Sequence, residues 1–232
     1  MGVEFTVNPG AGITREEIAA MRRSYGDAPI DALPQDPFEA LHIWMNEARN
    51  NPVIVEANAM VLSTLGQSRD GTREEISSRT VLLKDISAGG FTFFTNYSSR
   101  KAREIEFHEQ VTLLFPWYAM ERQIIISGDV MKISKEESAE YFATRPWSSQ
   151  IGAWASAQSS ELSSRDELEQ RFAGAAQKWP EGSIVPMPSH WGGYRVTPIS
   201  IEFWQGRNSR LHDRLRYERD NTGRWEITRY YP

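Results

Sequence analysis

Five short runs rich in β-branched and aromatic residues lie between residues 59 and 133, and they constrain the fold more than any other feature. The runs are separated by Gly, Asp or Ser residues or by a short stretch with a helical pattern. This spacing is typical of a sheet or barrel. The predicted strands are 59–65, 77–85, 91–96, 111–117 and 123–133.

Capping patterns predict helices on both sides of these strands. Ser, Thr or Asp stands before an apolar stripe, in several cases with Glu three residues later. The predicted helices are 14–25, 36–49, 98–107, 134–145 and 164–179, with a further one starting at Ser148 or Ser149. We therefore expect a mainly β fold with flanking helices, of the α+β class. Between the first two strands, 66–75 is predicted to be an exposed loop without chemistry.

A second pattern predicts a β-hairpin near the C-terminus. Two extended runs, 201–205 and 210–215, flank a stretch suited to a tight turn. Because side chains alternate along a strand, Arg210, His212 and Arg214 are expected on one face. Such a face can be ordinary solvated sheet. Neighbouring cations repel one another, however, so the pattern also fits a wall that contacts an anionic or polar aromatic ligand.

Two helix ends carry the residues of anion sites. Ser98 is expected to cap a helix whose first turn holds Arg100 and Lys101, where the helix dipole disfavours cations unless an anion is bound. Farther along, Tyr141 and Arg145 lie four residues apart before a break. A solvated charge pair and a routine surface pair are the alternatives to two phosphate sites.

Composition excludes several classes of function. The net charge of -5 argues against a general nucleic-acid binder. The chain has no Cys, and its 4 His lack metal-ligand spacing, so no metal is expected. No apolar run reaches the roughly 18 residues that span a bilayer, and no leader pattern is present. We expect a cytoplasmic protein without a membrane partner.

The hairpin also carries a family signature. Glu202-Phe203-Trp204-Gln205, followed after four residues by Arg210-Leu211-His212-Asp213-Arg214, resembles the C-terminal signature of the pyridoxamine 5'-phosphate oxidase family. The resemblance extends from about Met21 to Pro232. It implies a split β-barrel that binds FMN, and a homodimer with two FMN sites built from both subunits. The domain expectation is a flexible arm at 1–13 and one FMN-binding domain at 14–232, in which 14–25 is a substrate lid helix.

The same resemblance assigns roles to individual residues. Arg210 and His212 are expected to be the catalytic pair, with Arg210 over the substrate ring. Substrate contacts are implied for Arg22, Arg23, Tyr25, Lys84, Tyr141, Arg145, Ser149, Arg210, Leu211 and His212. Cofactor contacts are implied for Arg79, Thr80, Val81, Leu82, Leu83, Lys84, Phe94, Thr95, Arg100, Lys101, Gln123, Gln158, Ser159, Trp204 and Arg214.

The implied reaction is oxidation of pyridoxamine or pyridoxine 5'-phosphate to pyridoxal 5'-phosphate, with O2 reduced to H2O2. Two alternatives stay open at this point: a paralogous flavin oxidase of the phenazine-biosynthesis type, and a non-catalytic carrier of FMN or pyridoxal phosphate. Lys84, Tyr141, Arg145 and Ser149 argue against the paralogue, because a substrate without phosphate does not need all four.

Overall fold

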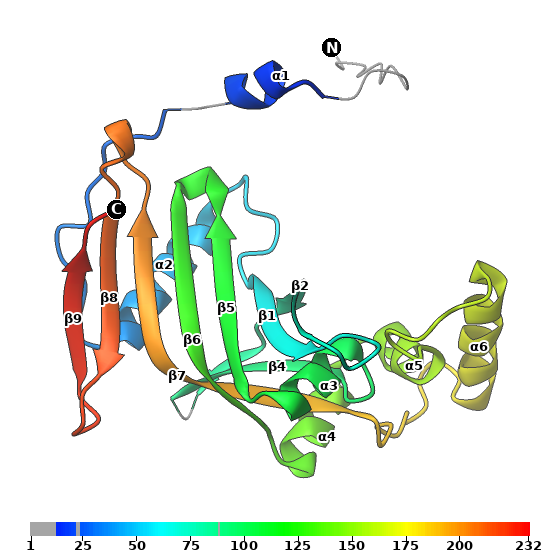
Figure 1. The fold of residues 1–232 in the computed structure, drawn as a ribbon. Helices are drawn as coiled ribbons and strands as arrows, with labels where there is room; N and C mark the ends of the chain where they lie inside the picture. Colours follow the sequence, from blue (N-terminus) through cyan, green and yellow to red (C-terminus); the bar gives the residue numbers. More distant parts are fainter. Residues whose placement is uncertain (1–12, 22–23, 88) are drawn as a thin grey trace.

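The computed structural model describes residues 13–21, 24–87 and 89–232. Within these ranges nine strands form one antiparallel sheet, and six helices flank it (Figure 1), which confirms the predicted class. The strands are β1 (Ala59–Gln67), β2 (Glu74–Leu82), β3 (Asp85–Ser87), β4 (Gly90–Asn96), β5 (Gln110–Trp117), β6 (Arg122–Lys132), β7 (Trp191–Gln205), β8 (Asp213–Arg219) and β9 (Trp225–Tyr230). The helices are α1 (Arg15–Ala20), α2 (Pro37–Asn50), α3 (Arg100–Phe107), α4 (Lys135–Thr144), α5 (Trp147–Ala155) and α6 (Arg165–Lys178), with short 3-10 turns at η1 (Tyr118–Met120) and η2 (Asn208–Arg210).

The sheet bends into a split barrel around β7. The strand order is β2-β1-β5-β6-β7-β4-β3. In addition, β8 pairs with the C-terminal part of β7, and β9 pairs with β8. Between Ser127 and Gly128 the β6–β7 register shifts, and a Cβ at Gly128 would lie 2.1 Å from the Thr197 carbonyl oxygen. Only glycine permits this close approach. Where β2 ends, the Lys84 N–H donates to the Thr92 carbonyl of β4 at 2.8 Å, which brings β2 against β4.

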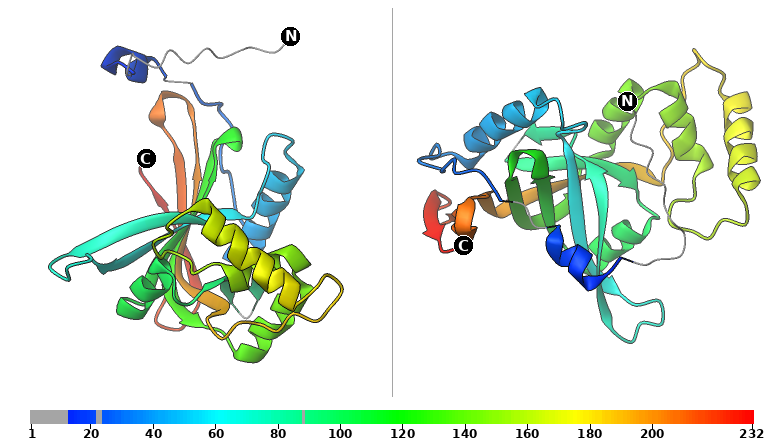
Figure 2. Two further views of the ribbon diagram at one scale, coloured as in Figure 1. Left: turned by 90° about the vertical axis from the view of Figure 1, so that its right-hand side faces the viewer. Right: turned by 90° about the horizontal axis from the view of Figure 1, so that it is seen from above.

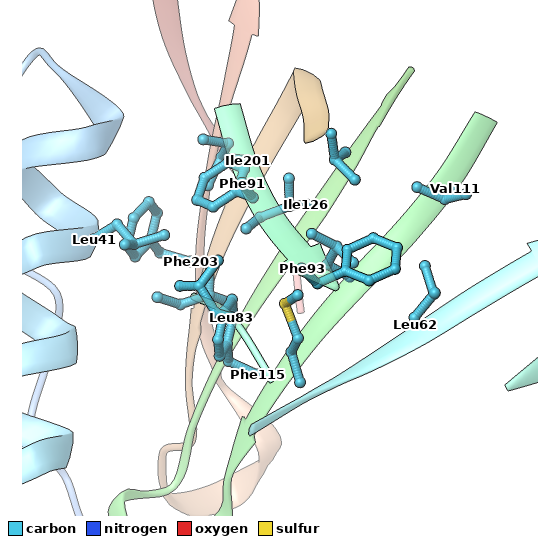
Figure 3. Close-up of a cluster of buried hydrophobic side chains, with 14 of the residues drawn as sticks. Leu41, Leu62, Leu83, Phe91, Phe93, Val111, Phe115, Ile126, Ile201 and Phe203 are labelled. Atoms are coloured by element: carbon cyan, nitrogen blue, oxygen red, sulfur yellow. The ribbon is translucent and has the colours of Figure 1, made fainter. Parts of the chain in front are cut away.

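The main core lies between α2 and the sheet. Asp36 caps α2 by accepting from the Phe38 N–H at 2.9 Å, and Pro37 occupies the first turn. Leu41 points from α2 toward the sheet near Phe203 (Figure 3), and both side chains are fully buried. Burying such a side chain stabilises the fold by roughly 1.5–3 kcal/mol. Figures 1 and 2 place α5 and α6 on the side of the molecule opposite β8 and β9.

The N-terminal helix is shorter than predicted. Thr14 and Glu17 form the expected capping box, but α1 ends at Ala20, so Tyr25 lies outside it. None of its residues is buried, so burial adds little to a short helix whose nucleus is costly to form. Arg22, Arg23 and the arm at 1–12 lie outside the described residues. Figures 1 and 2 show α1 beyond the tip of the β7–β8 hairpin.

Three other predicted boundaries were wrong. Ser99, not Ser98, precedes α3, because the Asn96 carboxamide accepts from the Ser98 N–H at 2.7 Å and holds it in a turn. The helix after Pro146 begins at Trp147 rather than at a serine. The stretch 66–75 is partly strand, since β1 and β2 pair as far as Gln67 opposite Glu74.

The C-terminal hairpin forms, but its second arm starts later than predicted. Trp204 pairs with Arg214, and β8 begins at Asp213, so Arg210 and His212 lie in the loop and not on a strand face. Ser209 and Arg210 have φ values of 57° and 62°, in the left-handed region that a strand cannot use. The predicted cationic strand face is therefore replaced by a turn.

Candidate active site

A cleft of about 850 Å³ opens between β2, β4 and the α4–α5 pair, and we call it the helix-side cleft. Many of the predicted ligand contacts converge here although they are far apart in sequence. Its predicted lining residues are Arg79, Thr80, Val81, Leu82, Lys84, Phe94, Thr95, Lys101, Tyr141, Arg145, Ser149 and Gln158. Arg79 lies on β2 and Lys84 follows the end of β2 at Leu82, and both side chains line the cleft.

Lys101 marks the first cationic part of this cleft. It lies in the first turn of α3 and is 9% exposed. Its Nζ donates to Gln158 Oε1 at 2.8 Å, Thr95 Oγ1 at 3.1 Å and Ser99 Oγ at 3.3 Å, all uncharged acceptors. Burial, together with the nearby Arg79 charge, lowers the pKa of Lys101 to about 8. A buried ammonium at a helix N-terminus favours an anionic ligand.

A buried carboxylate lies behind this part of the cleft. Glu104 accepts from Thr64 at 2.6 Å and Ser77 at 2.6 Å, and forms ion pairs with Arg79 at 2.9 Å and Arg100 at 2.7 Å. Burial opposes its ionisation, but these hydrogen bonds outweigh burial and lower the pKa of Glu104 to about 2. Glu104 was not predicted as a site residue, because a glutamate within a charged helix has the pattern of an ordinary surface residue.

Arg145 marks the second cationic part. Its guanidinium lies 4.8 Å from the Trp191 ring centroid. Trp191, Phe94 and Tyr141 form a nearly parallel stack, with Phe94 and Tyr141 centroids 4.0 Å apart. The buried Arg145 Nη1 has no hydrogen-bond partner among the residues that the structure describes, and burial lowers the Arg145 pKa. An unpartnered buried guanidinium N–H is costly and favours an anion.

Several lining residues had not been predicted, and Trp191 is the most informative of them. Trp191 begins the Trp-Gly-Gly-Tyr run that opens β7. The stack depends on pairing between β4 and β7, in which Phe94 lies opposite Gly193, and no local pattern reveals that register. The other additional lining residues are Asn96, Thr144, Pro146, Gly152, Ala153 and Ser156.

Three predicted cofactor residues belong to neither the helix-side cleft nor the hairpin loop. Leu83 is buried in the main core. Arg100 and Ser159 line a neighbouring cleft of about 820 Å³, where Arg100 also pairs with Glu75 at 3.3 Å. In this structure Arg100 is therefore bound to carboxylates.

The hairpin loop forms a separate site, the hairpin-side cleft, of about 830 Å³. Tyr25, Arg210 and His212 line it. The Tyr25 ring meets His212 edge-on at 5.6 Å and Trp204 at 5.9 Å. The Arg207 main-chain N–H donates to His212 Nδ1 at 3.0 Å. Nδ1 is thus an acceptor, so neutral His212 presents an N–H at Nε2.

The remaining predicted residues flank this loop. Leu211 is exposed, and Gln123 lies opposite Trp204 in the β6–β7 ladder. Arg214 makes a two-pronged ion pair with Glu202, at 2.8 Å and 3.0 Å, and this pair raises the Arg214 pKa. Its guanidinium is thereby fixed in orientation.

The two clefts lie at opposite ends of β7. Trp191 opens the strand at the helix-side cleft, and Trp204 lies near its other end, after roughly 40 Å of chain measured along the bent strand. Within the described ranges, no cluster of three His, Asp or Glu side chains could hold a metal ion. In the same ranges no helix has the length and apolarity to cross a membrane.

Comparison with known proteins identifies the family. Residues 47–179 match the family model described as pyridoxamine 5'-phosphate oxidase, and residues 191–232 match the pyridoxine 5'-phosphate oxidase C-terminal dimerisation region. The chain belongs to the pyridoxine/pyridoxamine 5'-phosphate oxidase family. Relatives named pyridoxine/pyridoxamine 5'-phosphate oxidase include one from Rubrobacter xylanophilus, 48% identical over 94% of this chain and 98% of that one. Another, from Streptomyces avermitilis, is 45% identical over 92% of this chain and 96% of that one.

Solved structures agree with this oxidase family and its fold. PhzG from Burkholderia lata, solved with tetrahydrophenazine-1-carboxylic acid, is 32% identical, covers 88% of this chain and 100% of its own, and superposes with a TM-score of 0.77. A pyridoxamine 5'-phosphate oxidase-related FMN-binding protein from Nostoc punctiforme shares 14% identity, with a TM-score of 0.66 over 86% of this chain and 100% of its own. The second likeness concerns the fold alone.

Proposed function

We propose that this oxidase uses FMN to convert pyridoxamine or pyridoxine 5'-phosphate to pyridoxal 5'-phosphate, with O2 as acceptor and H2O2 as product. The observation that carries the proposal is the pair of cationic parts in one cleft, at Lys101 and at Arg145. A phosphorylated cofactor and a phosphorylated substrate together supply two such anions. The family membership supports the same assignment.

The Lys101 part fits the phosphate of FMN. Among the described residues, Lys101 donates only to neutral oxygens, and burial already disfavours its charge, so a phosphate there would offset an existing electrostatic cost. The start of α3 has no side-chain cap among the described residues, and its N–H groups add to the attraction. Thr95 and Gln158, which both accept from Lys101 Nζ, hold the ammonium in place.

The Arg145 part fits the substrate phosphate. Arg145 has a buried N–H without a partner in the part of the chain that the structure describes, and Tyr141, Ser149 and Lys84 line the same cleft. A guanidinium fork, two hydroxyls and an ammonium match the oxygens of a phosphomonoester. The Trp191–Phe94 stack fixes this wall, so little side-chain entropy is lost when a ligand binds.

The flavin, when bound, supplies hydride acceptance and electron transfer to O2, and the protein positions the substrate. Arg210 and His212 carry the positioning role on the hairpin side. His212 offers an Nε2–H, which suits an oxygen acceptor on the substrate ring. Arg214, oriented by its ion pair with Glu202, would supply positive charge to stabilise the negative charge of a reduced cofactor.

A second copy of the chain is needed to complete this site. One chain holds the phosphate contacts and the hairpin contacts at opposite ends of β7, too far apart to meet on one small ligand. The match to a dimerisation region at 191–232 supports a homodimer. We propose that Gln123, Trp204, Arg210, His212 and Arg214 of one copy face the helix-side cleft of the other.

Mixed dimers test this arrangement directly. A Lys101→Met chain and an Arg210→Met chain are each expected to give a nearly inactive homodimer. Their heterodimer would contain one native site and one doubly altered site, so co-expression should recover activity. No recovery in purified heterodimers would refute the shared site.

The reaction itself is tested in one cuvette. Anaerobic pyridoxamine 5'-phosphate should bleach the flavin absorbance of the yellow protein, and air should restore it. A yellow protein that does not bleach would favour a substrate of the type bound by PhzG, or a carrier role. A colourless protein that FMN cannot reconstitute would overturn the proposal.

A further inference from the structure

Glu121, at the turn between β5 and β6, has an unusual backbone. It follows η1 and adopts φ 55° and ψ 34°, the left-handed conformation. For a residue with a side chain this conformation costs roughly 1–2 kcal/mol. Such strain persists only where the surrounding contacts determine the conformation. The contacts of Glu121 therefore indicate what the strained turn achieves.

Glu121 connects two segments that are distant in sequence. Its carboxylate Oε2 accepts from the Gly26 main-chain N–H at 2.7 Å. Its carbonyl oxygen accepts from the Gly206 N–H at 2.7 Å, at the base of the hairpin loop. The Gly26 carbonyl in turn accepts from the Asn208 N–H at 3.1 Å. Gly26 is thus held on both sides, by Glu121 and by the hairpin loop.

The packing around Gly206 is tight at the same point. A Cβ on Gly206 would lie 3.0 Å from Tyr25 Cγ and 3.2 Å from Glu121 Cβ. Tyr25, which directly precedes Gly26, lies against Trp204 and His212. Any displacement of Gly26 therefore moves the Tyr25 ring relative to both.

We propose that Glu121 is a positioning residue for substrate binding, which acts by holding Gly26 so that Tyr25 stays against Trp204 and His212. The inference rests on the proposed function, because the family resemblance implies that Tyr25 and His212 contact the substrate of that reaction. Glu121 itself does not line the hairpin-side cleft, whose described lining includes Tyr25, Arg210 and His212. Its influence on the substrate passes through Tyr25.

Three substitutions separate this role from a purely structural one. Glu121→Gln keeps an oxygen that accepts from Gly26 and should behave like wild type. Glu121→Ala removes the acceptor, and Glu121→Gly removes it while relieving the left-handed strain. Both should raise KM for pyridoxamine 5'-phosphate by roughly tenfold, the factor that 1.4 kcal/mol represents. The kcat and the FMN affinity should change little, and Glu109→Ala, at an exposed glutamate, serves as control.

A double-mutant cycle with Tyr25→Ala tests whether Glu121 affects substrate binding through Tyr25. If Glu121 acts through Tyr25, the two changes together should raise KM no more than Tyr25→Ala alone. Additive effects on KM, or unchanged KM in Glu121→Ala and Glu121→Gly, would overturn the inference while leaving the proposed function intact.

A measurement without ligand keeps the two proposals distinguishable. The Gly26 amide should exchange its hydrogen slowly in wild type and Glu121→Gln, and faster in Glu121→Ala. Equal hydrogen exchange at the Gly26 amide in all three proteins would show that Glu121 does not hold Gly26. If the wild-type protein oxidised neither phosphorylated substrate, the proposed function would be refuted instead. The exchange result would still show whether Glu121 holds Gly26.

Discussion

The helix-side and hairpin-side clefts hold their cations in different ways. Lys101 and Arg145 lie at helix ends and are held by side-chain contacts, with Lys101 buried and Arg145 half-buried. Arg210 is exposed on a left-handed turn, and its neighbours are held by main-chain hydrogen bonds between loops. The first cleft is rigid before any ligand arrives. The second depends on how three separate loops meet.

This difference suggests a division of labour. A buried cation without an anionic partner destabilises the free protein. A bound phosphate removes this destabilisation, and its affinity is higher for that reason. An exposed loop cation loses little in the free protein and adds little affinity. It contributes where precise placement matters, at the reacting end of the substrate.

The largest expected effect concerns Arg210. Arg210→Met should lower kcat by about a hundredfold or more, the size typical for losing one electrostatic contact to a transition state. FMN affinity should stay nearly unchanged, because Lys101 and its neighbours hold the phosphate. Steady-state oxidation and flavin fluorescence measure the two quantities. Arg219→Met, an exposed arginine on β8, is the control. If Arg210→Met lost FMN but still bound substrate, Arg210 would be a cofactor contact and not a substrate contact.

Lys101→Met should weaken FMN binding by about a hundredfold, as expected when a charged hydrogen bond is lost. The same variant should unfold at a higher temperature without FMN, because it removes a buried charge. The lowered Lys101 pKa costs stability fully below pH 8 and ceases to do so as the pH approaches 10.5, the ordinary value.

The pH dependence of cofactor binding sharpens this test. Above about pH 8 the free protein loses the Lys101 proton that a phosphate requires, so wild-type FMN affinity should fall as the pH rises. Lys101→Met should lack this decline. Riboflavin, which has no phosphate, is the matched ligand. A decline of equal slope for riboflavin would remove Lys101 from the phosphate site.

A slightly smaller effect is expected for Arg145. Arg145→Ala should raise KM for phosphorylated substrate by about thirtyfold, within the 1.5–3 kcal/mol of a charged hydrogen bond. Lys135→Ala, on the first turn of α4, is the control for a lost surface cation. A phosphate-free substrate should show almost no difference between wild type and Arg145→Ala. An unchanged KM would exclude Arg145 from the substrate phosphate.

The same comparison explains what sequence could predict. The helix-side cleft is built from regular helices and strands, so Lys101, Tyr141 and Arg145 were found from local spacing together with the family resemblance. Trp191 and Glu104 were missed because their roles depend on strand register and on burial. The hairpin loop was predicted as a strand arm, because spacing alone does not reveal two consecutive left-handed residues, Ser209 and Arg210.

The smallest effect tests whether that loop is strained. Ser209 adopts a left-handed conformation, which glycine tolerates without steric cost, although glycine also raises the entropy of the unfolded chain. Ser209→Gly should therefore raise the free energy of unfolding by only about 0.5 kcal/mol. Ser160→Gly, at an exposed serine without a positive φ, should lower it instead. If Ser209→Gly also destabilised the protein, the turn would carry no backbone strain at Ser209. The hairpin-side cleft would then be no more strained than the helix-side cleft.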